Sequence, residues 1–222
     1  MKKITLIGAA LAIVVMVCLS VPKYARAASL TKGYVSFTFD DGDKTLNSNV
    51  LPIFSKYSLP GTSYIVTDYV GDGAHVTWDQ ITTLQSKYGW EIGNHTKSHK
   101  SLIGLTDQGV MDELQGAQTA FLAHNIKNVQ ALAPPFGDFD ARTLSLMKLS
   151  GFLTSSRQAW TEGDSFNTSA NFNPWEINVV SLKSNVTVSQ VKALIDAAVK
   201  DKKWLVLVLH QIVAKPFGYL SI

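Results

Sequence analysis

Short apolar runs alternate with segments of helical periodicity along most of this chain. The runs are rich in β-branched and aromatic residues and predict seven strands, at 34–39, 62–66, 90–92, 129–133, 152–155, 177–182 and 204–209. Between the runs, apolar residues recur at spacings of three and four, which is typical of amphipathic helices. Strands that alternate with helices predict βα units and a parallel sheet.

Local signals mark where several of the helices begin. Thr77 with Gln80, and Thr187 with Gln190, have the spacing of a capping box, so a helix is expected directly after each threonine. A further helix has Pro52 in its first turn, where a missing N–H is tolerated. The expected helices cover residues 49–57, 78–88, 110–121, 141–150 and 188–198.

These elements fit one α/β domain. Seven strands and their helices in residues 28–222 predict a deformed (β/α) barrel with irregular or missing units. An open, doubly wound sheet is the competing fold, and periodicity does not separate the two. Barrels gather their chemistry on the loops after the C-terminal ends of strands, so the positions of the polar residues discriminate between them.

The positive charge of the chain lies largely near its start. The formal charge is +3, from 20 Lys and Arg against 17 Asp and Glu. Residues 1–27 contain four of the bases and no acid, which leaves 16 bases and 17 acids in residues 28–222. A nearly neutral domain gives no reason to expect nucleic acid as a partner. A content of 46% hydrophobic residues indicates a full core and excludes a disordered chain.

Residues 1–27 have the three parts of a signal peptide. A basic pair precedes an apolar stretch over 4–21, and residues 25–27 (Ala-Arg-Ala) form a small-x-small cleavage signal. The stretch has 18 residues, close to the ~20 that span a bilayer, so an uncleaved membrane anchor is the alternative. Either way we expect residues 28–222 to be secreted or associated with the cell envelope. Cys18 lies in this leader, and a thiol-free domain suits an oxidising exterior.

Two polar motifs directly follow predicted strands. The first strand runs into Asp40-Asp41-Gly42, where one carboxylate can face a metal while its neighbour faces water or substrate. The third strand is followed by His95 and His99, whose spacing of four puts both imidazoles within reach of one cation. One carboxylate and two imidazoles are three ligands and leave positions open, which is typical of a catalytic metal site.

Two further strand ends carry candidate residues. His210 follows the apolar run 205–209, which is expected to be buried on both sides. His210 would therefore face the mouth of the barrel, the end where the C-terminal ends of the strands and the other motifs lie. A hydrogen-bonded structural histidine is the alternative. Residues 134–137 (Pro-Pro-Phe-Gly) form a rigid turn that could aim a backbone N–H into the mouth, or simply join a strand to a helix. Four segments distant in sequence meet on one face only in the barrel, and their agreement favours that fold.

In this order, the motifs resemble those of the polysaccharide deacetylases, carbohydrate esterase family four. The resemblance covers residues 33–213 and rests on the segments 38–42 (TFDDG), 95–99 (HTKSH), 133–137 (APPFG) and 207–210 (LVLH). It implies a deformed barrel and hydrolysis of N- or O-acetyl groups on a polysaccharide. The candidate substrates that it implies are peptidoglycan, chitin-type oligomers, poly-N-acetylglucosamine and acetylxylan.

The resemblance also implies catalytic roles. Asp41, His95 and His99 would bind a divalent metal, most often zinc, while Asp40 would be the general base and His210 the general acid. The chemistry agrees with this division, because hydrolysis of an amide at neutral pH needs an activated water, a stabilised oxyanion and a protonated leaving group.

Substrate contacts are expected from two segments. The turn at Pro135 and Phe136 would supply an oxyanion contact through the Phe136 N–H. The predicted loop 156–176 follows the fifth strand and should lie beside the mouth. Trp160 and Trp175 in this loop are expected to stack on sugar rings, with packing of at least one of them onto the barrel as the alternative.

The chain departs from the family pattern at three places. Ala133 stands where the family commonly has an arginine that pairs with the base, so Asp40 is expected to lack that partner and to be oriented by another group. The aspartate that usually tunes the acid histidine is not evident near residues 173–175. The chain ends 12 residues after His210, a shorter tail than is usual in the family.

These departures keep a second function open, a glycan-binding protein of the same fold that has lost catalysis. Hydrolysis of another bond, such as a phosphoester, is a third hypothesis, although only Lys97 and Lys100 lie near the expected ligands. For the deacetylase we expect a monomer whose partner is an acetylated polysaccharide or oligosaccharide, with the membrane involved only if the leader is not cleaved.

Overall fold

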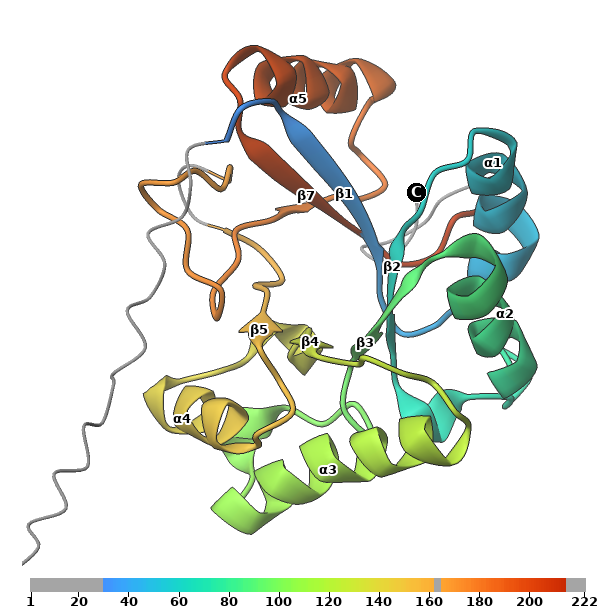
Figure 1. The fold of residues 1–222 in the computed structure, drawn as a ribbon, viewed down its shortest axis with the longest axis vertical. Helices are drawn as coiled ribbons and strands as arrows, with labels where there is room; N and C mark the ends of the chain where they lie inside the picture. Colours follow the sequence, from blue (N-terminus) through green and yellow to red (C-terminus); the bar gives the residue numbers. More distant parts are fainter. Residues whose placement is uncertain (1–29, 162–164, 215–222) are drawn as a thin grey trace, which may run out of the picture.

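The computed structural model describes residues 30–161 and 165–214 (Figure 1). The predicted signal peptide, residues 1–27, lies outside these ranges and stays a prediction. Within the described ranges, no helix has the length and apolarity that crossing a bilayer demands.

Seven strands form one curled sheet at the centre of the molecule (Figure 1). They are β1 (Tyr34–Phe39), β2 (Thr62–Ile65), β3 (Glu91–Asn94), β4 (Ala131–Leu132), β5 (Ser155–Ser156), β6 (Val180–Ser181) and β7 (Trp204–Leu209). Their order is β5-β4-β3-β2-β1-β7-β6, and every neighbouring pair is parallel. The predicted parallel sheet and its seven strands are confirmed.

The two edges of the sheet meet through the residues that follow β5 and precede β6. Arg157 and Ile177 form a parallel bridge. The N–H of Ile177 donates to the carbonyl of Ser156 at 3.1 Å, and the N–H of Gln158 donates to the carbonyl of Ile177 at 3.0 Å. These bonds close the sheet irregularly, so the deformed barrel is confirmed over the open, doubly wound sheet.

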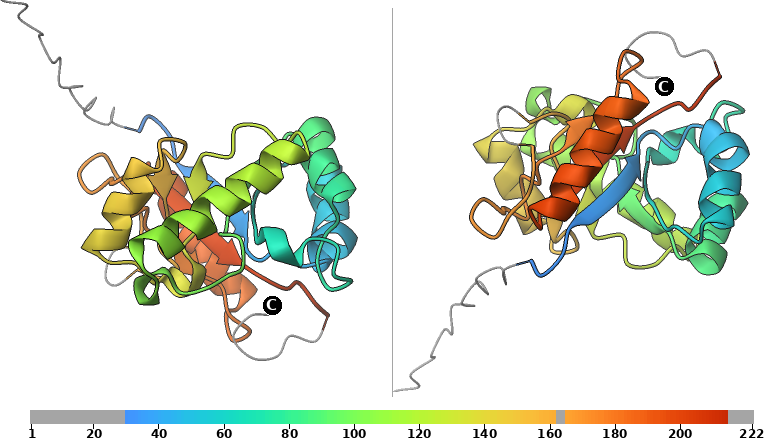
Figure 2. Two further views of the ribbon diagram at one scale, coloured as in Figure 1. Left: turned by 90° about the horizontal axis from the view of Figure 1, so that it is seen from below. Right: turned by 90° about the horizontal axis from the view of Figure 1, so that it is seen from above.

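Within the described residues, five α-helices surround the strands, and each follows a strand in sequence (Figure 1). They are α1 (Leu51–Lys56), α2 (Trp78–Tyr88), α3 (Asp107–Ala123), α4 (Ala141–Leu149) and α5 (Val188–Lys200). Both predicted capping boxes are present, at Thr77 with Gln80 and at Thr187 with Gln190. Figure 2 shows α5 lying across the β1 side of the sheet, where it packs on β1 and β7.

The fifth strand is shorter than its apolar run predicts. Phe152 and Leu153 do not extend the strand; they pack into an apolar cluster beneath α3 and α4, with Leu114 and Met147. Pairing with β4 therefore begins only at Ser155. The backbone after β5 then continues the ladder, which places the next residue, Arg157, at the mouth of the barrel.

Candidate active site

The two predicted catalytic residues and one predicted metal ligand occupy the first position after their strands. Asp40 follows β1, His95 follows β3 and His210 follows β7. The ladder continues through this position, since the N–H of Asp40 donates to Leu209 at 2.9 Å and that of His95 donates to Ile65 at 3.0 Å. Together with Asp41 and His99, these side chains line one cavity of about 540 Å³ at the C-terminal ends of the strands.

Asp41, His95 and His99 converge as a three-ligand cluster. Their ligand atoms all lie within 4.8 Å of one another. Oδ1 of Asp41 is 3.3 Å from Nε2 of His95 and 3.4 Å from Nε2 of His99. In a tetrahedral zinc site with ligand distances of about 2.0–2.1 Å, ligand atoms are separated by about 3.3–3.4 Å. The cluster therefore has the spacing of a metal site.

The surroundings of these ligands also suit a cation. Oδ1 of Asp41 is buried without a hydrogen-bond partner among the described residues. Nδ1 of His95 lies 2.6 Å from the carbonyl oxygen of Ala133, a contact that assigns its proton to Nδ1 and leaves the lone pair of Nε2 facing Asp41. Burial raises the pKa of Asp41, but the neighbouring imidazoles lower it by more. The net pKa lies below its ordinary value, so this carboxyl is ionised. A carboxylate and two imidazoles facing one another fit a divalent metal.

The backbone is strained at the same place. Asp41, Thr96, His99 and Phe136 have φ values of 66°, 68°, 59° and 61°, in the left-handed region that non-glycine residues seldom adopt. Each such residue costs of the order of 1 kcal/mol or more, and such strain clusters at functional sites. These four residues lie in three different loops of one cavity, so its geometry is maintained by contacts outside the loops.

One of these contacts comes from Glu113 on α3. This side chain is buried, and it accepts hydrogen bonds from the N–H of Ser98 at 2.7 Å and from the Ser98 hydroxyl. Ser98 lies immediately before His99. Glu113 therefore attaches the loop that contains the two histidines to α3.

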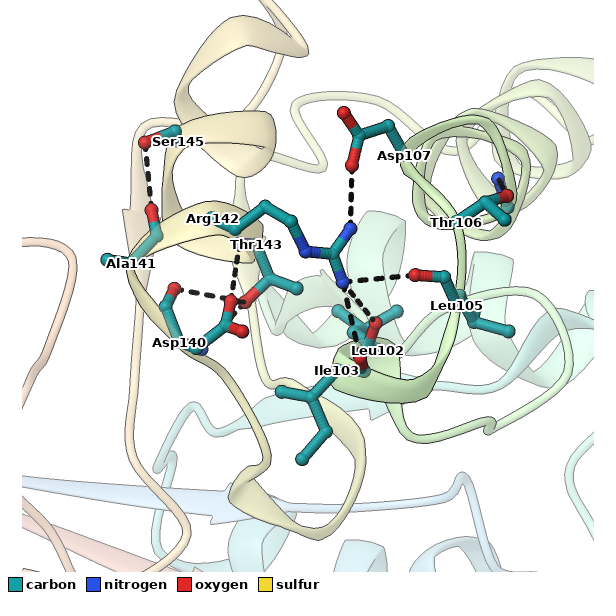
Figure 3. Close-up of polar contacts among 11 residues, drawn as sticks. Leu102, Ile103, Leu105, Thr106, Asp107, Asp140, Ala141, Arg142, Thr143 and Ser145 are labelled. Carbon is teal, nitrogen blue, oxygen red and sulfur yellow. Dashed lines mark hydrogen bonds and ion pairs between the residues drawn. The ribbon is translucent and has the colours of Figure 1, made fainter.

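A second anchor lies where this loop meets α3, and Figure 3 shows it in detail. Nη2 of Arg142, on α4, donates to the carbonyls of Leu102, Ile103 and Leu105 at 3.5, 3.2 and 3.0 Å. Nη1 of Arg142 pairs with Asp107 at 2.7 Å. One guanidinium thus joins α4 to the turn that precedes α3.

Arg157 is a residue of the site that the sequence motifs did not indicate. Its Nη2 forms an ion pair with Oδ1 of Asp40, and the two residues are only 2% and 5% exposed. Oδ2 of Asp40 lies 3.7 Å from Nε2 of His210. Burial raises the pKa of Asp40, but Arg157 and the nearby imidazoles outweigh burial and hold it below its ordinary value. Asp40 is therefore oriented by a group other than residue 133, as expected, but the expectation that it has no charge partner is wrong, since Arg157 supplies one.

Two half-exposed aromatic side chains form one wall of the cavity. Phe136 is 55% exposed and packs edge-on against the ring of His99 at 4.7 Å, and Trp160 is 53% exposed. A Cβ on Gly137 would lie 2.6 Å from Cβ of Ala159, so the loops that carry the two aromatic residues approach each other only because residue 137 is glycine. Phe136 and Trp160 therefore lie where the sequence predicts contacts with a substrate.

The structure corrects the positions expected for two other residues. Pro135 is buried, and it is Pro134 that lines the cavity. Trp175 is not part of the cavity lining; it packs against the apolar cluster beneath α3 and α4, with the Lys148 ammonium 5.7 Å from its ring centre. The segment before β6 turns back along β5, so Trp175 faces the helices and only Trp160 remains at the mouth.

Known proteins match the chain in sequence and in fold. Curated relatives include poly-beta-1,6-N-acetyl-D-glucosamine N-deacetylases from Staphylococcus aureus (strain MSSA476), 30% identical over 142 residues, and from Staphylococcus epidermidis, 28% identical over 142 residues. Both matches cover 58% of this chain and 49% of the relative, so the chain spans about half the length of these relatives.

The fold is similar to that of solved deacetylases. Streptococcus pyogenes deacetylase PplD in complex with acetate has a TM-score of 0.64 at 19% identity, over 72% of this chain and 69% of that one. Residues 27–154, more than half of the sequence, match the family described as Polysaccharide deacetylase. They include both the Asp40-Asp41 motif and the two histidines of the metal-type cluster. This chain therefore belongs to the polysaccharide deacetylase family.

Proposed function

We propose that this protein is a metal-dependent hydrolase that removes N-acetyl groups from a polymer of β-1,6-linked N-acetylglucosamine. The observation that carries the proposal is the single cavity in which Asp41, His95 and His99 form a metal-type cluster beside Asp40 and His210. The choice of polymer is supported by the names of the staphylococcal relatives.

Asp41, His95 and His99 would hold the metal, with Zn²⁺ the first candidate. A divalent cation bound there supplies a Lewis acid that polarises the acetyl carbonyl and lowers the pKa of water. The buried, unpartnered oxygen of Asp41 and the tautomer imposed on His95 by Ala133 support this assignment.

The remaining residues divide the proton transfers between them. Asp40 accepts a proton from the attacking water, for which Arg157 keeps it ionised and Oδ2 is directed toward His210. Hydroxide adds to the acetyl carbon, and the Phe136 N–H is assigned as a donor to the resulting oxyanion. His210 then gives a proton to the amide nitrogen as the C–N bond breaks. The products are acetate and a free amino sugar.

The cavity wall suits a sugar chain. Phe136 and Trp160 expose apolar ring faces beside the ligands, on which pyranose rings can stack. The near balance of charge in residues 28–222 also suits a neutral polymer. Because such a polymer lies outside the cell, we propose that residues 1–27 direct export, and that the exported domain acts as a monomer.

The alternative function, a glycan-binding protein that has lost catalysis, has less support from the structure than from the sequence. It rests on the aspartate that is missing near residues 173–175, on the short tail, and on Ala133, which removes the charge partner expected for Asp40. Arg157 provides that charge from the neighbouring strand. Both residues proposed to move protons are present.

Acetate release is the direct test. The purified protein with Zn²⁺ is expected to release acetate from poly-β-1,6-N-acetylglucosamine and to lose this activity after chelation. His95→Ala should abolish both Zn²⁺ binding and acetate release. His124→Ala is a matched control, because that imidazole stacks on Trp78 at 4.0 Å outside the cavity lining, and it should leave both intact. Absence of acetate release from this polymer would refute the proposed substrate, and absence from peptidoglycan, chitin oligomers and acetylxylan as well would refute the deacetylase activity.

A further inference from the structure

The guanidinium of Arg157 is held on three sides next to the cavity without lining it. Nη2 contacts Oδ1 of Asp40, and Nη1 donates to the carbonyl of Gln158 at 2.8 Å. The centre of the guanidinium lies 4.7 Å from the centre of the Tyr64 ring. Its plane and its position are therefore both fixed, and its charge is directed at one oxygen of Asp40.

Glycine on the neighbouring strand makes room for the Tyr64 ring. Tyr64 on β2 pairs with Gly93 on β3. A Cβ at Gly93 would lie 2.4 Å from Cδ1 of Tyr64, a distance that real Cβ atoms do not tolerate. The missing side chain lets the ring lie across β3, where it forms the floor under Arg157. The buried pair thus rests on a surface built from two strands.

Register places Arg157 next to Ala133. Leu132 on β4 pairs with Ser156 on β5, and the ladder continues because the N–H of Arg157 donates to the carbonyl of Leu132 at 3.0 Å. Ala133 and Arg157 are thus neighbours in one row, and neighbours in a row of parallel strands point to the same side. The arginine that the family resemblance places at Ala133 has its counterpart one strand away.

We propose that Arg157 is the positioning residue of Asp40, taking the role left open by Ala133. This inference rests on the proposed function, in which Asp40 is the base. A guanidinium is always charged, so it compensates the buried carboxylate under all working conditions. By fixing Oδ1 it leaves Oδ2 directed toward His210 and the cavity. Arg157 acts on the reaction only through Asp40.

Kinetics and metal binding together test this role. Arg157→Ala is expected to lower kcat by about 10- to 100-fold, less than the 10²–10⁴-fold that a general base contributes. KM and Zn²⁺ affinity should stay unchanged, because Arg157 neither lines the cavity nor contacts the metal-type cluster. Arg157→Lys should recover part of kcat, and so should Ala133→Arg added to Arg157→Ala. A Zn²⁺ affinity that falls in step with kcat would overturn the proposal.

A second measurement does not depend on activity. Urea unfolding is compared for Arg157→Ala in the wild-type and in the Asp40→Asn background. The substitution should destabilise the wild type and have little effect in Asp40→Asn, where no carboxylate is left unpaired. Equal destabilisation in both backgrounds would overturn the pairing even if the enzyme is active. Coupling in a protein that releases no acetate would instead refute the proposed function and leave the pair in place.

Discussion

Glu113 offers a test of how the metal-type cluster is held together. It is buried on α3 and belongs to neither the cluster nor the cavity lining, yet it binds Ser98 through two hydrogen bonds. Ser98 precedes His99, whose backbone is in the left-handed region with φ 59°. Glu113→Ala removes the acceptor for both bonds, so the loop keeps only contacts with the backbone of α3, such as the bond from the Lys97 N–H to the Glu113 carbonyl at 3.1 Å.

The expected magnitude follows from these contacts. A hydrogen bond to a charged group contributes about 1.5–3 kcal/mol, so two such bonds set a loss of about 3–6 kcal/mol in the free energy of unfolding. The lower end is expected, because water can reach Ser98 in part. Lys100 adds little, since its side chain is 64% exposed and its ammonium lies 3.6 Å from the carboxylate. Glu113→Gln keeps the shape and one acceptor and should lose about 1–2 kcal/mol.

Metal affinity is the informative measurement. Loss of a contact that orients a ligand weakens metal binding by about 10- to 100-fold, which we expect for Glu113→Ala. Zn²⁺ affinity is measured by competition with a chromophoric chelator, and stability by urea unfolding. Asp112→Asn is the matched control, because Asp112 is the preceding residue on α3 and accepts from Gln108 at 2.8 Å near solvent. Wild-type Zn²⁺ affinity in a folded Glu113→Ala protein would show that the loop holds His99 without this anchor.

Four other substitutions separate contacts with substrate from contacts that stabilise the fold. Trp160→Ala should raise KM about tenfold, equivalent to about 1.4 kcal/mol of stacking. Trp175→Ala should leave KM unchanged and lower the free energy of unfolding in urea by about 2–3 kcal/mol. A raised KM for Trp175→Ala and a destabilised Trp160→Ala would exchange their roles. Arg142→Ala should destabilise the protein by about 2 kcal/mol through its lost bonds to carbonyls, and an unchanged unfolding midpoint would show that the clamp of Figure 3 is dispensable. Gly93→Ala should cost about 1–3 kcal/mol by overpacking Tyr64 and should also lower kcat; full activity would mean that the ring can move without disturbing the site.

Features set by local chemistry could be predicted from the sequence. The two threonine-glutamine capping boxes involve residues three apart, and both are present. The convergence of Asp41, His95 and His99 followed from one rule, that each motif comes directly after a parallel strand. This rule needs the existence of the strands but not their exact ends.

Features set by packing between distant segments could not be predicted. Trp160 and Trp175 lie in one loop and look alike in sequence, yet one faces the cavity and the other an apolar cluster. Their fates differ because the segment before β6 pairs with the residues after β5, and periodicity carries no information about that bridge. The sequence places Arg157 in the predicted loop 156–176, with nothing to indicate a role, whereas the structure continues the ladder through it.

The residues that directly follow the strands form a row around the barrel. This row explains how the base can keep a guanidinium partner although its motif lacks the arginine. Asp40, His95, Arg157 and His210 are each the first residue after a strand, at the level where the mouth begins. Moving a residue one strand sideways within such a row displaces its backbone by only about 4.8 Å and leaves its side chain on the same face. The long, flexible stem of arginine can absorb that displacement, so a guanidinium from either row position can reach one carboxylate. A short side chain such as Asp41 has no such freedom. When a motif position has lost its charged residue, the whole row should therefore be searched for a replacement before activity is excluded. Metal ligands should tolerate relocation to a neighbouring strand far less than a long charged side chain does.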